Sequence, residues 1–238
     1  MSSQKDRYLS TRNEMLSRLP RPDYERLRPR LELVRLPRGR VVYGAGDTLR
    51  HIYFITGGMV SLLATTLDGH TVEVAMVGSE GAVGALSLLR INVVPYQVEA
   101  QLPVTALRLS LAAPAAECER GGHLHDLLLR YLHTLFTQIT QSALCNRYHT
   151  IEQRLCRWLL VGRDRALTDH LALTQASLAH MIGSQRTGVT AAAAALQRRG
   201  LINYRRGKIK LLDGPGLEAR SCECYGVTAR EIEQYLAP

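Results

Sequence analysis

The chain has 238 residues, of which 46% are hydrophobic and 21% are charged, so it can form one or two domains with a packed core. No apolar run approaches the roughly 18 residues of a membrane helix, and the N-terminal stretch lacks the apolar core of a signal peptide, so we expect a cytoplasmic protein without membrane contact. The formal net charge of +9 indicates a polyanionic partner, with nucleic acid the first candidate.

The first 110 residues change from polar to strand-rich. Residues 1–30 are polar, and Pro20, Pro22 and Pro29 restrict them to short helical turns. Residues 31–109 are rich in Val, Ile, Thr and Tyr, and glycine-containing turns such as Gly44–Asp47 interrupt them at short intervals. Many short strands joined by such turns predict a small antiparallel sandwich or barrel.

A long helix is predicted from about Leu124 to about Tyr148. Apolar residues recur there in alternating steps of four and three, which is the pattern of one seam along a long helix. We expect this seam to pair two copies of the chain through Leu128, Leu132, Leu135 and Ile139. The alternative is an amphipathic helix that lies on its own barrel.

The stretch LTQASLAHMIGSQRTGVTAAAAALQRRG predicts two short helices joined by a glycine turn, which is a helix-turn-helix. Thr174 is the expected N-cap of the first helix, and Gly183 is its expected stop. Ser184 is the expected cap of the second helix, which runs from Gln185 to Arg199. In the helix before this pair, Trp158 is expected to be a core anchor.

The second of these helices has two faces. Val189, Ala193 and Leu196 follow the i, i+4, i+7 spacing of a core-facing stripe. Alanines on the other face keep the helix slim enough to approach base edges in a major groove about 12 Å wide. We therefore expect contacts with bases from Gln185, Arg186, Thr187 and Thr190. Arg186 can form a bidentate pair with guanine at the helix start.

A basic hairpin follows Gly200, where LINY, RRGK and IKLL are typical of a strand, a turn and a strand. Such a wing would lie beside the DNA backbone. We expect phosphate contacts from Ser184, Arg198, Arg199, Arg205, Arg206 and Lys208. The alternative is an alanine-rich core helix with a solvated basic hairpin. However, the helix pair, the slim second helix and the basic hairpin occur in the order of a winged helix-turn-helix.

This order of barrel, long helix and winged helix-turn-helix resembles the CRP/FNR family of bacterial transcription regulators over residues 15–215. In the barrel, YGAGDTLRHIYFITGGMVSLL resembles the family's strand–Gly-Asp–strand–Gly entry. In the DNA-binding part, the residues that match the family pattern are Gly183, Arg186, Val189, Leu196, Gly200, Leu201 and Ile202. The resemblance implies a homodimer joined along the long helix, a two-fold symmetric operator and contact with RNA polymerase.

The chain departs from the known effector-binding branches of this family. Cyclic-AMP binders have a Gly-Glu pair and an Arg-Ser-Ala segment, where this chain has Gly84-Ala85 and PYQVE at residues 95–99. Both charged contacts are missing and Glu99 would repel an anion, so cyclic AMP is not expected. The iron–sulfur branch needs an N-terminal cysteine cluster, and the first cysteine here is Cys118, so no such cluster is expected. The sequence leaves open whether the barrel binds a heme or another small effector. The candidate pocket for it consists of Gly84, Ala85, Arg90 and Gln97.

The remaining chemical motifs point away from a metal site and an enzyme. The five cysteines are expected to be reduced, and Cys222 and Cys224 are too few for a zinc site, because other candidate ligands are distant in sequence. No catalytic triad, P-loop or paired-carboxylate motif stands out. One rival is a barrel enzyme that uses His51 or His70. Another is a small-molecule or cyclic-nucleotide binding module that acts through a protein partner rather than DNA.

We therefore predict an α+β chain with four parts. These are a cyclic-nucleotide-binding-like β-barrel (15–122), a dimerisation helix (123–150), a winged helix-turn-helix (151–215) and a tail helix (216–238). The predicted function is a homodimeric, sequence-specific transcription regulator that binds a palindromic operator, with a small effector in the barrel as its possible switch.

Overall fold

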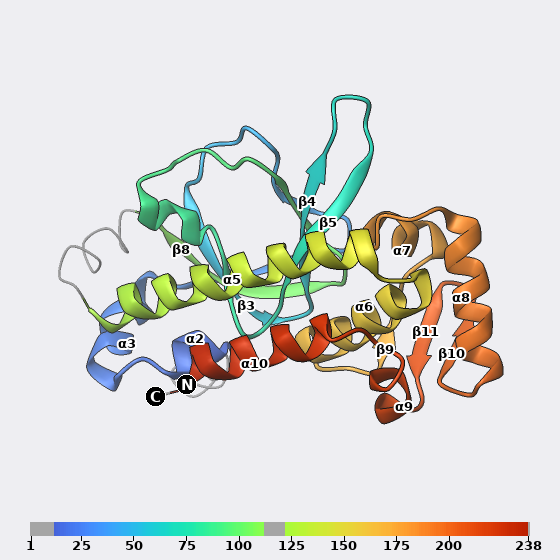
Figure 1. Ribbon diagram of the computed structural model, residues 1–238. Coiled ribbons are helices and arrows are strands. Elements are labelled where there is room, and N and C mark those ends of the chain that lie inside the picture. Colours follow the sequence, from blue (N-terminus) through green and yellow to red (C-terminus); the bar gives the residue numbers. More distant parts are fainter. Residues whose placement is uncertain (1–11, 112–121, 238) are drawn as a thin grey trace.

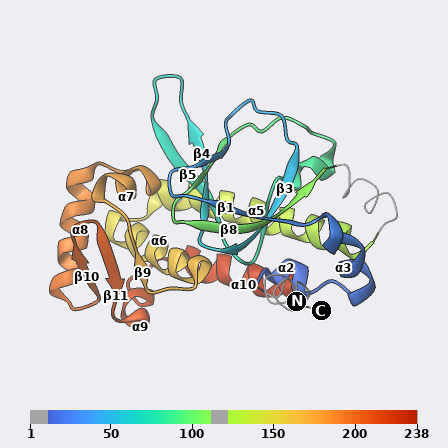
Figure 2. The ribbon, with the colours of Figure 1, turned by 180° about the vertical axis from the view of Figure 1, so that it is seen from behind.

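The computed structural model describes residues 12–111 and 122–237. Figure 1 shows a barrel, a long helix α5 (His123–Tyr148) that crosses it, and a smaller head beyond the end of that helix. The reverse view in Figure 2 shows the same arrangement, with the head beside the barrel. Among the described helices, none combines the length and apolar character needed to cross a membrane.

Two short helices and a 3-10 turn precede the barrel: α2 (Glu14–Ser17), α3 (Arg21–Leu27) and η1 (Arg28–Arg30). The N-cap residue Asn13 is fully buried and ties α2 to the barrel. Its Nδ2 donates to the carbonyls of Ile55 at 2.8 Å and Gly81 at 2.9 Å. Its Oδ1 accepts from the backbone N–H of Leu16 at 3.0 Å, so all of its polar side-chain atoms are used.

The barrel consists of two antiparallel four-stranded sheets. The first has the order β1 (Glu32–Leu36), β8 (Val104–Ser110), β3 (His51–Gly57) and β6 (Ala82–Val83). The second has the order β2 (Val41–Tyr43), β7 (Gln97–Ala100), β4 (Val60–Thr65) and β5 (Thr71–Val77). A 3-10 helix, η2 (Ala85–Leu89), follows β6. The predicted antiparallel barrel is confirmed.

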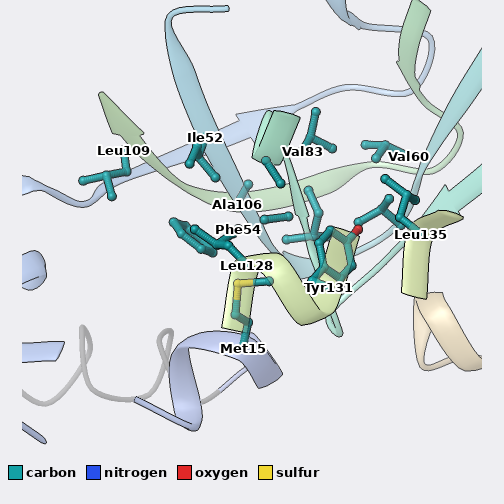
Figure 3. Packing of buried hydrophobic residues seen from close by; sticks show 14 of the residues in the cluster. Met15, Ile52, Phe54, Val60, Val83, Ala106, Leu109, Leu128, Tyr131 and Leu135 are labelled. Carbon is teal, nitrogen blue, oxygen red and sulfur yellow. The ribbon is translucent and has the colours of Figure 1, made fainter. Parts of the chain in front are cut away.

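The barrel core is completed by side chains from outside the sheets. Figure 3 shows Phe54 of β3 beside Met15 of α2 and Leu128 of α5, with Tyr131 of α5 in the same buried cluster. Met15, Phe54 and Leu128 are fully buried, and Tyr131 is 2% exposed. The absent side chain at Gly81 permits this packing, because a Cβ there would lie 2.4 Å from the Tyr131 ring. Helix α5 therefore closes one side of the barrel.

Two of the four residues of the predicted dimer seam on α5 need correction. Leu128 is fully buried and Leu135 is 8% exposed, both in the core of their own barrel. Leu132 and Ile139 are partly buried and pack against the same core. An apolar stripe at this spacing predicts a packed helix face but does not identify the partner surface. For Leu128 and Leu135 that partner is the chain's own barrel, as in the alternative given above, whereas the pairing through Leu132 and Ile139 stays a prediction.

The head contains α6 (Ile151–Ala166), β9 (His170–Leu171), α7 (Gln175–Met181), α8 (Arg186–Arg198), β10 (Ile202–Arg205), β11 (Lys208–Leu211) and α9 (Gly214–Glu218). Helix α6 begins with a capping box, in which Thr150 and Gln153 bond to each other's backbone N–H. Trp158 on α6 is 2% exposed in a second hydrophobic core, so its predicted role as a core anchor is confirmed.

The tail helix α10 (Cys224–Leu236) runs back beside α5, as both views show (Figures 1 and 2). The guanidinium of Arg130 on α5 donates to the carbonyl of Gln234 at 2.9 Å. The ring of Tyr235 lies 5.5 Å from the ring of Tyr131. The tail therefore covers a face of α5, a position that the sequence alone did not predict.

A buried carboxyl joins the barrel to the head. Glu73 on β5 is 8% exposed and accepts a hydrogen bond from the indole N–H of Trp158 at 2.8 Å. The Ser61 hydroxyl donates to the other oxygen of the same carboxyl. Burial raises the pKa of Glu73 to about 7, although both hydrogen bonds and the charge of Arg157 act in the opposite direction. A carboxyl with a raised pKa therefore lies at the barrel–head junction.

Candidate nucleic-acid interface

Helices α7 and α8 form the predicted helix-turn-helix. Thr174 caps α7 by accepting from the backbone N–H of Ser177 at 3.1 Å, and Gly183 takes a φ of +57° just after α7 ends. The predicted cap at Ser184 is wrong, because α8 has Gln185 as its N-cap residue, without a side-chain bond. The N–H of Ser184 instead bonds to the carbonyl of Ala179 at 2.9 Å, so this residue closes the end of α7.

The two faces of α8 are confirmed. Val189 and Leu196 are fully buried and Ala193 is 3% exposed. The opposite face is exposed at Thr187, Thr190, Ala191, Ala194 and Arg198. The exposed face is therefore slim, with two methyl groups at its middle and polar groups at its start.

The predicted base contacts lie at the start of this exposed face. Gln185, Arg186 and Thr187 are all exposed. Thr190 is also exposed, but its hydroxyl lies 2.8 Å from the Gln175 side-chain oxygen and donates within the helix pair. Gln175 was not among the predicted residues, since no sequence spacing relates the start of α7 to the second turn of α8.

The wing is the hairpin of β10 and β11. Its two-residue turn has positive φ at both Arg206 (49°) and Gly207 (73°), which is the geometry of a tight type I′ hairpin. The predicted contacts Arg205, Arg206 and Lys208 are exposed there. A groove of about 530 Å³ runs along the wing, and its lining includes these three cations together with His170, Asn203 and Lys210. The wing lies next to α8 (Figure 1), so its exposed cations add positive charge beside that helix.

The two predicted phosphate contacts at the end of α8 differ. Arg198 is exposed. Arg199 forms an ion pair with Glu152 of α6 at 2.9 Å, and Arg220 pairs with the same carboxylate at 3.1 Å. The guanidinium of Arg199 therefore braces α8 against α6 and is less available to a phosphate than the wing cations.

Of the four residues of the candidate effector pocket, three lie in or next to η2 and Gln97 begins β7. Ala85 is 3% exposed, so its methyl group is part of the core, whereas Arg90 is exposed. Gln97 donates to Glu99 at 2.9 Å, so its amide is engaged by the carboxylate that was expected to repel an anion. Gly84 has a φ of +95°, and a Cβ there would lie 2.5 Å from a backbone oxygen. The pocket stays a prediction.

Two domain models match the chain. The cyclic nucleotide-binding domain matches residues 33–120, and the Crp-like helix-turn-helix domain matches residues 153–220. Together they cover more than half of the chain.

Curated relatives and solved structures agree with these matches. The global nitrogen regulator of Nostoc sp. strain PCC 7120 is 26% identical over 181 residues, which span 72% of this chain and 81% of that protein. The regulator of the same name from Synechocystis sp. strain PCC 6803 is 27% identical over 187 residues, or 72% and 80% of the two chains.

Among solved structures, FixK2 from Bradyrhizobium japonicum shares the fold with a TM-score of 0.70 at 15% identity, covering 81% of this chain and 98% of that one. A CRP-family transcriptional regulator from Thermus thermophilus gives a TM-score of 0.67 at 22% identity, covering 79% and 96%. Barrel, long helix and helix-turn-helix thus occur here in the family's order, with both family domains matched, and the chain belongs to the CRP/FNR family of transcription regulators.

Proposed function

We propose that this transcription regulator acts as a homodimer in the cytoplasm and reads a two-fold symmetric operator with α8 of each protomer in the major groove. The slim exposed face of α8 beside a basic wing is the observation that supports this proposal most directly. The half-sites would lie about one helical turn apart, about 34–36 Å. Contact with RNA polymerase belongs to the same proposal and rests on the family resemblance.

Exposed apolar side chains on α5 support pairing of the protomers. Leu129, Phe136, Leu144 and Tyr148 are 41%, 65%, 40% and 75% exposed. Leu129 and Phe136 are seven residues apart and therefore share a face, which lies about a quarter turn from the side that holds Leu128 in the barrel. We place the dimer seam along the face of Leu129 and Phe136.

The barrel is proposed to respond to something other than cyclic AMP or an iron–sulfur cluster. Ala85 has a methyl group where the cyclic-AMP binders have a carboxylate, and its exposed fraction of 3% leaves it in the core. The N-terminal cysteines of the iron–sulfur branch are missing from the sequence. These residues do not select between a heme and another small molecule as the effector.

Replacement of Arg186 by alanine should relax operator specificity at one base pair by about 1–3 kcal/mol, because a bidentate guanine contact is lost. Selection of bound sequences from random duplexes, with wild type and variant in parallel, measures this directly. Arg186→Lys serves as the matched control, since it keeps the charge but not the planar fork, and it should also lose specificity. An unchanged sequence preference in both variants would contradict the assignment.

Replacement of Lys208 by alanine should weaken binding to operator and random DNA alike. The plot of log K against log salt has a negative slope, and one fewer phosphate contact should make it less steep by about 1. Arg40→Ala removes one positive charge from an exposed barrel position and should leave the slope unchanged. If both variants behave alike, net charge rather than the wing sets the affinity.

The rival class, a binding module that acts through a protein partner, predicts a different result. Its basic head would show no salt-dependent DNA affinity, and the selection with wild type would enrich no palindrome. If repetition in cell extract, which supplies small effectors, also enriched no palindrome, the DNA-reading proposal would be replaced by this alternative.

A further inference from the structure

Three cysteines and one histidine from distant parts of the chain meet where α5 ends and α10 begins. Cys145 lies in the last turn of α5, and His149 is the C-cap residue of that helix. Cys224 is the first residue of α10, and Cys222 lies just before it. The Sγ atoms of Cys145 and Cys222 are 3.6 Å apart, and the Sγ of Cys224 is 3.6 Å from Nδ1 of His149. Each residue places one ligand atom within 4.8 Å of all the others.

The cluster is enclosed and stands apart from the two hydrophobic cores. Cys145 and Cys224 are fully buried, Cys222 is 5% exposed, and the His149 side chain is 11% exposed. The three cysteines contact one another in a separate small cluster rather than filling gaps among aliphatic side chains. Buried thiols that only fill a core would not need a histidine nitrogen directed at them.

The second nitrogen of His149 has the partner that metal-bound histidines usually have. Its Nε2 lies 3.3 Å from a carboxylate oxygen of Glu223, while Nδ1 faces the sulfur of Cys224. A carboxylate on the outer nitrogen orients the ring and strengthens the inner nitrogen as a ligand. The charges of Arg154 and Arg157 also act on sulfurs of the cluster.

The spacing of the ligand atoms suits a single tetrahedral ion. Zinc bond lengths of about 2.3 Å to sulfur and about 2.0–2.1 Å to nitrogen give tetrahedral edges of about 3.8 Å for S–S and about 3.6 Å for S–N. The two distances of 3.6 Å match these edges. An iron–sulfur cluster would hold the thiolates further apart, because several iron and sulfide ions lie between them.

We propose that Cys145, His149, Cys222 and Cys224 bind one Zn²⁺ ion in a closed structural site. On binding, the three thiols release their protons, and three thiolates with the divalent ion leave one net negative charge that the two arginines offset. Four protein ligands leave no position for a substrate, which is typical of a structural site. The ion would fasten the tail helix to the end of α5.

The same site borders the helix-turn-helix. Arg154, whose charge acts on the cluster, donates to the carbonyl of Gly183 at 3.0 Å in the turn between α7 and α8. The zinc site therefore lies where the long helix, the tail and the DNA-reading head meet. Sequence reasoning missed it because the residues of the Cys145–Cys222 pair are 77 positions apart.

Elemental analysis of the full chain, purified under reducing conditions without added metal, tests the proposal. We expect about one zinc ion per chain in wild type and loss of most of it in Cys222→Ser and Cys224→Ser. Cys156→Ser is the matched control, because Cys156 is equally buried but lies in the second hydrophobic core, and it should keep its zinc. Glu223→Ala should retain the site with about tenfold weaker affinity.

Replacement by Co²⁺ gives a readout that does not depend on DNA binding. Sulfur-to-cobalt charge-transfer absorption and the visible bands of tetrahedral cobalt should appear in wild type and disappear in the two cluster variants. If those variants do not fold, titration of wild-type thiols with a mercurial reagent should still release the zinc. Three results would overturn the proposal. Wild type would take up no zinc, would contain iron with acid-labile sulfide, or would carry a Cys145–Cys222 disulfide after anaerobic purification.

Discussion

Replacement of Phe136 by glutamate is expected to convert the dimer into monomers at micromolar protein concentration. Phe136 is 65% exposed on the face of α5 that it shares with Leu129. In a two-fold pair of helices, the two introduced carboxylates would be desolvated close to each other, at a cost of several kcal/mol. The fold of each protomer should be unaffected, because the side chain makes no part of the barrel core.

The loss of the dimer should be visible in DNA binding as well. Two linked heads bind two half-sites with an effective concentration that raises affinity by about 100- to 10,000-fold, and a monomer loses this gain. Sedimentation and operator titration together measure both effects. Leu67→Glu is the matched control, since Leu67 is fully exposed between β4 and β5, outside the helix. A Phe136→Glu protein that remains dimeric would place the seam elsewhere.

Replacement of Glu73 by glutamine is expected to stabilise the protein above about pH 7. The unfolded carboxyl loses its proton near its ordinary pKa of 4.5, whereas burial in the folded protein raises the pKa to about 7. Between these two values the folded state binds more protons, so the free energy of unfolding falls as pH rises. Above the upper value, the buried charge costs about 3 kcal/mol. Glutamine has the same shape and no charge, so this cost disappears.

Urea unfolding at about pH 5 and about pH 8 tests the sign of this effect. The variant should gain about 3 kcal/mol over wild type at the higher pH and much less at the lower one. Glu218→Gln, at an exposed position of α9, is the control and should change neither value. A constant difference between Glu73→Gln and wild type across the range would mean that the carboxyl does not titrate there. Since Glu73 accepts from Trp158, the group that titrates lies at the contact between barrel and head.

Local chemistry made the DNA-reading part predictable from sequence. Gly183 ends α7, and the spacing of Val189, Ala193 and Leu196 sets the buried face of α8. These signals lie within a few residues of the structure they determine. The paired strands of the wing follow from the alternation of residues 202–211 in the same way.

Contacts between distant segments were not predictable in this way. The stripe through Leu128 and Leu135 fits a dimer seam and a barrel cover equally well, and only the three-dimensional arrangement decides between them. The hydrogen bond between Glu73 and Trp158 joins residues 85 positions apart, and neither residue type signals the other. The same holds for the tail helix, whose position depends on a face of α5 that the sequence leaves unassigned.

The turn of the wing also bears on attempts to make this protein more heat-resistant. Arg206 has a φ of 49°, where a residue with a Cβ is strained by about 1–2 kcal/mol and where Asn or Gly is the usual occupant of a two-residue hairpin. A stability screen or a consensus redesign would therefore select Asn or Gly at this position. Such a gain in melting temperature would remove one of the wing cations, so thermal selection and regulatory output should be scored separately when this scaffold is engineered.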